Sequence, residues 1–171
     1  MKFHEQRGLS LIETMIAMVI LLIGIISVMS LFAVSVTQNT NQGDFATRTT
    51  EYCQDKMEQL LALSFSDSAT NTAVYPPATS GGTGLGSGLA PSGTVGSVNT
   101  ASPTTGYVDY LDASGNLLAN STGWFYKRQW SISLDATGTM KTITVVAIAK
   151  TQAGSGTPPW TTLVSYKTSV S

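Results

Sequence analysis

The sequence predicts an α+β fold in which one long N-terminal helix packs on a small antiparallel β-sheet. An uncharged apolar run extends from Met15 to Val36, and residues 37–63 continue it with apolar side chains at helical spacing. Strand-like alternation of apolar and polar residues follows from Tyr107 onward. Because an amphipathic helix and one face of a sheet both need an apolar partner, we expect them to share one core.

The apolar run is long enough to cross a membrane. At ~1.5 Å per residue it makes about 33 Å of helix, and only three serines interrupt it. Lys2 and Arg7 precede the run, whereas Asp44 is the first charge after it, so the N-terminus is expected in the cytoplasm and the remainder outside. A cleaved secretory signal would have a shorter run and an A-x-A site, which SLFAVSV does not provide. A plain signal anchor stays an alternative.

Residues 37–63 predict an amphipathic continuation of the same helix. No proline occurs before residue 76, so one helix from about residue 9 to 63, roughly 80 Å long, is expected. Gly24 is its one weak point, and at most modest melting is expected there. The only cysteine, Cys53, falls on the apolar face, which favours a buried thiol over the alternative of an intermolecular disulfide. The positions at apolar spacing are Phe45, Thr49, Tyr52, Cys53, Lys56, Met57, Leu60 and Leu61.

Residues 64–106 differ in composition from the rest of the chain. They are rich in glycine, serine, threonine and proline and have no hydrophobic periodicity, which is typical of a long connection without regular structure. A flexible low-complexity loop is the simpler interpretation. A specific adhesive or subunit-contact surface is the alternative.

Residues 107–171 predict an antiparallel sheet. YVDYL, GWFYKRQWSISLD, MKTITVVAIAK and WTTLVSYKTSV read as strands separated by turn-forming clusters. The last three are sequential, which suggests a meander with one face on the helix. Trp124, Tyr126 and Trp130 are expected in that core, and a ligand-binding aromatic patch is the alternative.

Little in the sequence indicates catalysis, a cofactor or a metal. The only histidine, His4, lies in the N-terminal leader, and no Cys, His or carboxylate cluster has ligand spacing. The glycines at 81–88 lack the Gly-Lys-Ser/Thr ending of a phosphate loop. With a net charge of −1 and no basic stripe, no nucleic-acid partner is predicted.

One short motif accounts for Glu13, whose carboxylate is energetically unfavourable in an apolar helix. Glu13 places a carboxylate at the start of the apolar helix, within the sequence Gly8-Leu9-Ser10-Leu11-Ile12-Glu13 that follows a short basic leader. This combination resembles the class III signal of type IV pilins and pseudopilins. The resemblance implies cleavage between Gly8 and Leu9 and N-methylation of Leu9, where the family usually has phenylalanine. It strictly covers residues 1 to about 36.

The resemblance also implies a role for Glu13 in assembly. In this family the carboxylate pairs with the new N-terminal amine of a neighbouring subunit, so that an axial slip would leave two buried charges unpaired. No further site residue and no cofactor is implied. The implied pilin-like layout is a leader at 1–8, a membrane or filament-core helix at 9–36, its amphipathic continuation at 37–63, a variable connection at 64–106 and a sheet at 107–171.

The order of elements resembles PilV-type minor pilins, which have an R-x-W strand, here Arg128-Gln129-Trp130. A single cysteine also rules out the C-terminal disulfide loop common in major pilins. The expected function is that of a minor pilin, held in the inner membrane with its head in the periplasm and then in a pilus at the cell surface. Expected partners are prepilin peptidase, major and other minor pilins, the inner-membrane assembly platform and, before assembly, lipid. A pseudopilin of a type II secretion or competence system and a signal-anchored periplasmic binding module are the alternatives.

Overall fold

The computed structural model describes residues 10–150 and 158–169. The chain divides into two compact units, residues 1–42 and residues 43–171, which are described in turn. We refer to the second unit as the head.

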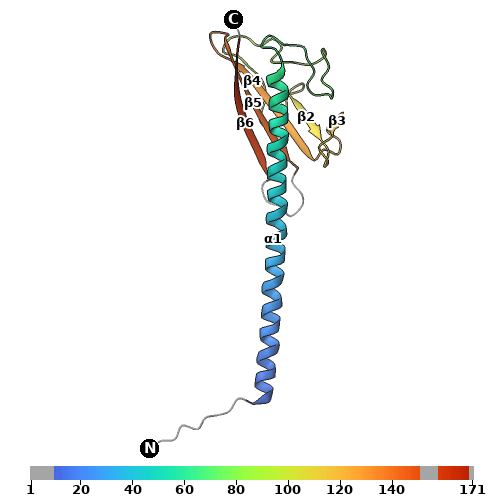
Figure 1. Ribbon diagram of the computed structural model, residues 1–171, viewed down its shortest axis with the longest axis vertical. Helices are drawn as coiled ribbons and strands as arrows, with labels where there is room; N and C mark the ends of the chain where they lie inside the picture. The colour runs from blue at the N-terminus through green and yellow to red at the C-terminus, as the bar shows by residue number, and fades with distance from the viewer. Residues whose placement is uncertain (1–9, 151–157, 170–171) are drawn as a thin grey trace, which may run out of the picture. The chain divides into compact units, whose positions relative to one another are not determined.

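The first unit is helical throughout its described part from Leu11. It is the N-terminal portion of helix α1 (Leu11–Ala62), whose bounds agree closely with the expected helix of residues 9–63 (Figure 1). Every side chain from Leu11 to Gln42 is exposed. The hydroxyls of Ser27 and Ser30 donate to carbonyl oxygens one turn earlier, at 2.8 and 2.9 Å, so these polar groups satisfy their hydrogen bonds within the helix.

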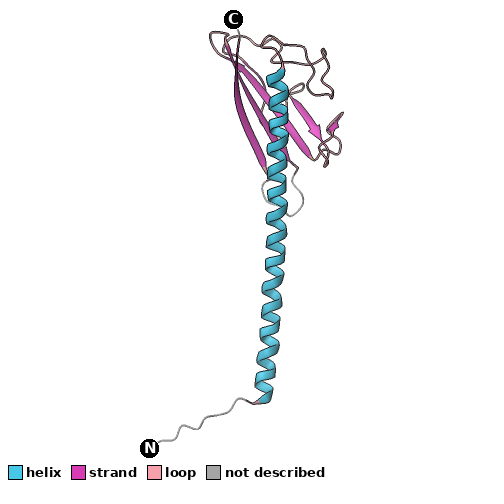
Figure 2. Ribbon diagram, viewed as in Figure 1, coloured by secondary structure: helices cyan, strands magenta, loops and turns pink. Residues whose placement is uncertain are grey.

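The head contains the rest of α1 and a six-stranded antiparallel sheet (Figure 2). Neighbouring strands follow the order β3-β2-β4-β5-β6, and β1 pairs with β4 beyond the end of β2. The expected meander is formed by β4, β5 and β6. The strands are β1 (Thr94–Gly96), β2 (Val108–Leu111), β3 (Leu117–Leu118), β4 (Tyr126–Leu134), β5 (Met140–Ala149) and β6 (Trp160–Thr168).

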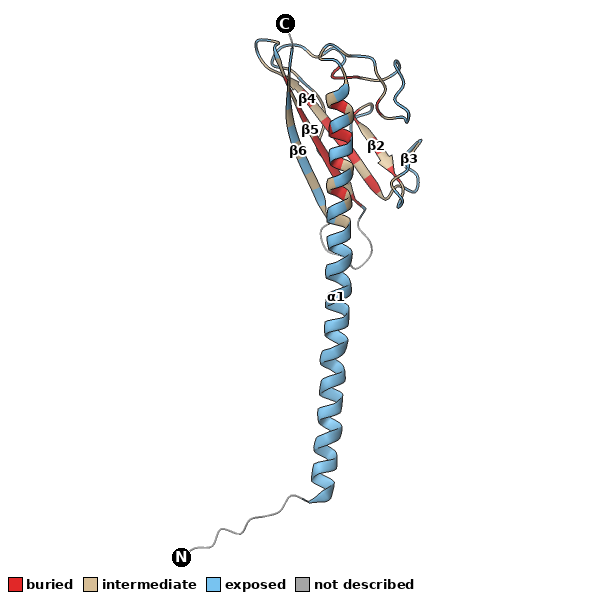
Figure 3. Cartoon of the chain, viewed as in Figure 1, coloured by how far each residue is buried: buried red, intermediate tan, exposed pale blue. Residues whose placement is uncertain are grey.

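The core lies between α1 and one face of the sheet (Figure 3). Cys53 and Leu60 of α1 are completely buried, as are Trp130 of β4 and Val145 of β5. The Cys53 thiol donates to the Val145 carbonyl oxygen at 3.3 Å. The prediction of a long N-terminal helix packed on a small antiparallel sheet is therefore confirmed, and so is the buried Cys53.

The expected core position of Trp124 is wrong. Tyr126 and Trp130 are buried, but Trp124 precedes β4, is only half-buried and belongs to neither core cluster. Its ring lies 6.3 Å from that of Tyr110, centroid to centroid, and the ammonium groups of Lys127 and Lys150 lie over it. Trp124 therefore extends an aromatic and cationic surface on the face of the sheet away from α1.

The connection at 64–106 has more structure than its composition suggested. It contains β1, whose Val95 pairs with Ile132, and it buries Leu85 completely in the main core. Gly96 has φ +76°, and a Cβ there would collide with the Trp130 carbonyl oxygen. The pairing of β1 therefore depends on a glycine at this position.

Candidate processing and assembly site

The first described residues form the N-terminal cap of α1. The Glu13 amide donates to the Ser10 carbonyl oxygen at 3.0 Å and to Ser10 Oγ at 3.3 Å. Ser10 is thus the N-cap and Glu13 the third helical residue. Ser10-x-x-Glu13 has the spacing of a capping box. The negative charge of Glu13 also interacts favourably with the positive end of the helix dipole.

The cap gives Glu13 a local role that sequence reasoning missed, although the Ser-x-x-Glu signature is present in the sequence. A carboxylate here is compatible with a helix start whether or not a second chain is present. Of the sequence-predicted site residues, the structure describes only Glu13, which is exposed in the first turn of α1. The predicted cleavage site, Gly8 and Leu9, lies outside the described residues.

The helix that follows presents a continuous apolar surface. It is long enough and apolar enough to cross a membrane, and none of the segment that meets this test is buried. Gly24 lacks a side chain and leaves a notch on this surface. The notch is bordered by Leu21, Ile25, Val28, Met29 and Phe32. Small residues of this kind permit close approach of helices in an apolar environment.

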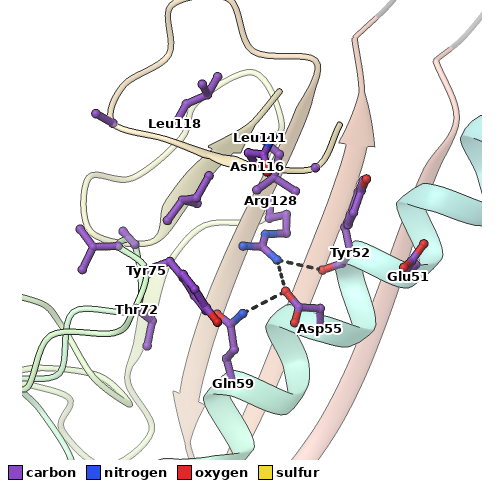
Figure 4. A pocket seen from close by; sticks show the side chains of 15 residues that line it. Glu51, Tyr52, Asp55, Gln59, Thr72, Tyr75, Leu111, Asn116, Leu118 and Arg128 are labelled. Carbon is purple, nitrogen blue, oxygen red and sulfur yellow. Dashed lines mark hydrogen bonds and ion pairs between the residues drawn. The ribbon is translucent and has the colours of Figure 1, made fainter. Parts of the chain in front are cut away.

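In the head, α1 is joined to the sheet by a buried ionic cluster. The Asp109 carboxylate of β2 accepts from Lys56 Nζ at 2.7 Å and from Arg128 Nε and Nη2 at 2.8 and 2.9 Å. Arg128 Nη1 also donates to Asp55 at 2.6 Å (Figure 4). Two cations and two carboxylates from α1, β2 and β4 therefore hold the helix on the sheet.

The electrostatics of this cluster follow from its burial. Lys56, Asp109 and Arg128 have side chains that are at most 4% exposed, whereas that of Asp55 is 55% exposed. Burial lowers the pKa of the Lys56 ammonium, and attraction to Asp109 opposes that shift. Burial also acts to lower the pKa of Arg128. The attraction and hydrogen bonds of Asp109 and Asp55 outweigh burial, so the pKa of Arg128 is raised. Lys56 also lies 4.5 Å from the centroid of the Trp130 ring and donates to the Thr72 carbonyl oxygen at 2.7 Å.

Sequence reasoning did not assign this cluster. The available signal was a lysine, Lys56, at a position with apolar spacing, together with Arg128 two residues before a core tryptophan. A charged residue at a core position requires a buried partner. Asp109 could not be selected from sequence because its pairing depends on β2 lying beside β4.

A cleft of about 690 Å³ opens beside the cluster, between α1 and the β2–β3 edge. Its α1 wall carries Glu51, Tyr52 and Asp55, and Tyr75 lies across from them (Figure 4). Leu111, Leu117 and Leu118 give it an apolar side. We call it the acidic cleft.

The described residues suggest no reactive centre in the head. Within 10–150 and 158–169, no three His, Cys, Asp or Glu side chains are placed to hold a metal ion. Burial raises the pKa of the Cys53 thiol, which keeps it protonated. A completely buried, protonated thiol is a packing group rather than a nucleophile.

Comparison with known proteins gives one match. A family model described as the prokaryotic N-terminal methylation motif matches residues 4–36. No curated protein and no solved structure matches the chain. The family is a structural, pilin-type one rather than an enzyme family. The chain thus carries the prepilin signal, which supports the pilin and pseudopilin family and implies processing by prepilin peptidase and pilus assembly with other pilins.

Proposed function

We propose that this chain is a minor type IV pilin-like subunit, processed by prepilin peptidase and incorporated into a pilus filament or its priming complex. The observation that carries the proposal is the methylation motif at residues 4–36, directly followed by an exposed apolar helix. Such a helix needs either lipid or other helices around it, and a filament core supplies the second.

Processing converts the N-terminus into a binding group. Hydrolysis of the Gly8–Leu9 peptide bond adds water across it, leaving the Gly8 carboxylate on the leader and a free amine on Leu9. That amine, before or after methylation, is cationic at neutral pH. In a helical filament core it pairs with Glu13 of a neighbouring subunit, because neither charge is stable alone among apolar side chains.

The PilV-type minor subclass is supported by the Arg128-Gln129-Trp130 strand and by the single cysteine. We place the head in the periplasm before assembly and on the pilus surface afterwards, with the N-terminus cytoplasmic until cleavage. Pseudopilins share the N-terminal motif, so a type II secretion or competence pseudopilin is the second candidate. Deleting the gene should abolish piliation under the first proposal and secretion or DNA uptake under the second.

The test is mass spectrometry of the mature N-terminus combined with filament incorporation. Wild-type chain should begin with N-methyl-leucine at Leu9. Glu13→Val and Glu13→Gln should both be cleaved yet be absent from sheared filaments. Glu13→Gln is the sharper variant, because Ser-x-x-Gln is also a capping-box sequence and the substitution removes only the charge.

Two matched variants separate charge pairing from helix capping. Ser10→Ala removes the cap, at about 1 kcal/mol, and keeps the charge, so it should enter filaments. Thr14→Val changes the adjacent helical position and should also enter. An intact Met1, a cut near Ala33, or normal incorporation of Glu13→Gln would refute the proposal.

A further inference from the structure

The large exposed apolar side chains of the head fall into two groups. Among its described residues, these are Val74 and Tyr75 on one side and Trp160, Val164 and Tyr166 on the other. Tyr75 is 81% exposed, Trp160 60% and Tyr166 63%. Clustered exposure of this kind marks interaction surfaces, whereas scattered single residues do not. We call Trp160, Val164 and Tyr166 the β6 patch.

The β6 patch lies on the face of the sheet away from α1, along the edge strand. Thr161, the residue after Trp160, contacts the hydroxyls of Thr49 and Thr50 of α1, so alternation turns Trp160 outward. Trp160 pairs with Ile148 of β5. Lys150, two residues beyond Ile148, is exposed and lies over Trp124 on this same face. This end of the patch is therefore aromatic and cationic.

The second group borders the acidic cleft at the opposite edge of the sheet. Val74 and Tyr75 line it together with Glu51 and Asp55 of α1. Glu51 is exposed, and the Asp55 side chain remains 55% exposed although it pairs with Arg128. The cleft offers an apolar and aromatic interior with two carboxylates at its α1 wall. Arg128 also lines it and pairs with Asp55, so Glu51 supplies the negative charge that a partner would meet.

We propose that the β6 patch of one copy of this chain docks into the acidic cleft of a second copy. Trp160 enters the cleft between Tyr75 and the leucines of β2 and β3, and Lys150 faces Glu51. The two surfaces match in polarity and in charge, as the centres and rims of specific interfaces do. Buried aromatic anchors supply most of the binding energy in such contacts.

The arrangement favours a head-to-tail contact. A two-fold contact between β6 patches would leave Lys150 without the Glu51 carboxylate of the acidic cleft. Contact between opposite edges instead pairs unlike charges, and it leaves the first copy with an unused cleft and the second with an unused patch. Such a heterologous contact continues as an open chain when the rotation does not close a ring. The contact does not require leader cleavage, so it can fail or hold independently of the proposed function.

Thiol crosslinking of full-length chain in membranes tests the contact. Thr162→Cys lies between Trp160 and Val164 of the β6 patch and Ala119→Cys lies in the acidic cleft, and both positions are exposed. Two differently tagged chains, one with each substitution, should give a mixed dimer with a short bis-maleimide. Each variant expressed alone should give none. Parental chain controls for the buried Cys53, and Ala136→Cys, exposed in the β4–β5 turn, is the matched control for Ala119→Cys.

A charge exchange makes the test specific to Lys150 and Glu51. Lys150→Glu on the Thr162→Cys chain should lower the mixed dimer at least about tenfold, because like charges then meet. Glu51→Lys on the Ala119→Cys chain should do the same, and the two together should restore it. Both residues are exposed, so unchanged thermal melting should show that the head still folds.

Three outcomes would overturn the proposal. These are a dimer from Thr162→Cys alone, which indicates a two-fold contact; a mixed dimer that the charge exchange does not restore; and crosslinks only to other proteins. The mature N-terminus is measured on the same samples. Crosslinking with an uncleaved leader would reject the proposed function and leave the head contact standing.

Discussion

At the scale of single residues, Asp109 is the carboxylate that joins the two cations of the ionic cluster. Its two oxygens accept from Lys56 and Arg128, and the side chains of all three residues are at most 4% exposed. Buried ion pairs add little stability over an apolar substitute, yet removal of one member leaves the others uncompensated. The cluster therefore fixes how α1 lies on the sheet more than it adds to stability.

Asp109→Asn should destabilise the head by about 3–5 kcal/mol, because it leaves two buried cations with only the half-exposed Asp55. Thermal melting of the detergent-solubilised full chain, followed by tryptophan fluorescence, would measure the loss. Asp44→Asn removes the exposed pair with Arg48 and should cost under about 1 kcal/mol. Equal effects of the two variants would contradict the role of the cluster.

Asp135 gives the head a specific pH dependence. Hydrogen bonds from Thr137, the Met140 and Thr139 amides and the Thr139 hydroxyl lower its pKa from 3.8 to about 2. A lowered carboxyl pKa means that the unfolded chain binds the proton first, so this stabilisation is complete above about 4 and is lost as the pH falls toward 2. The difference in free energy of unfolding between wild type and Asp135→Asn should shrink across that window. Parallel curves would argue against these hydrogen bonds.

At the scale of elements, α1 is one helix with two kinds of surface. Up to Gln42 all its described side chains are exposed, whereas from Thr49 onward one stripe is buried against β4, β5 and β6. Its last turn contains no basic residue, and Lys167 of β6 instead donates to the Leu61 carbonyl oxygen at 2.6 Å. The sheet therefore satisfies a helix end that the helix itself does not cap.

Leu60→Ala should cost about 2–5 kcal/mol of head stability, because the side chain of Leu60, on α1, is completely buried against the sheet. Val164→Ala is the control within the same head, since Val164 is 53% exposed and should cost little. Thermal melting followed by tryptophan fluorescence would compare the loss of stability in the two variants. A larger effect at Val164 would mean that the β6 patch is covered within the chain, and would remove the basis for an external partner.

At the scale of the whole molecule, the two units require different surroundings. The first exposes an apolar helix that is consistent with a single-pass membrane anchor, and the head has its own core. The proposed function would require both properties, because the helix would leave the lipid for a filament while the head stays folded in water. The division at Gln42 separates the two kinds of surface along the sequence.

Leu22→Arg combined with Ile26→Arg should release the chain from membranes during alkaline extraction. Each arginine near the centre of the span costs about 3 kcal/mol of insertion free energy. The matched control is Thr47→Arg with Gln54→Arg, two exposed positions of α1 in the head, which should remain in the membrane fraction. Retention of the first variant would show that the apolar run is not the anchor.

The sequence by itself determined the elements whose signals are local. The uninterrupted apolar and amphipathic spacing without proline predicted α1 almost to its ends, and alternation predicted β4, β5 and β6. The motif from Gly8 to Glu13 indicated its family because its information lies in a few adjacent residues. These features need no knowledge of which strand lies beside which.

Only the tertiary structure decided the features that depend on distant pairing. β1 has no periodicity of its own and forms because β4 offers it a free edge beyond β2. Trp124 shares the parity of Tyr126 and Trp130 but precedes the strand, so alternation no longer fixes its side. Asp109 becomes the partner of Lys56 and Arg128 only when α1, β2 and β4 converge. The sequence therefore determined the helix, the main strands and the prepilin signal, whereas the ionic cluster and the two exposed surfaces arise from contacts between segments far apart in the chain, which no local pattern encodes.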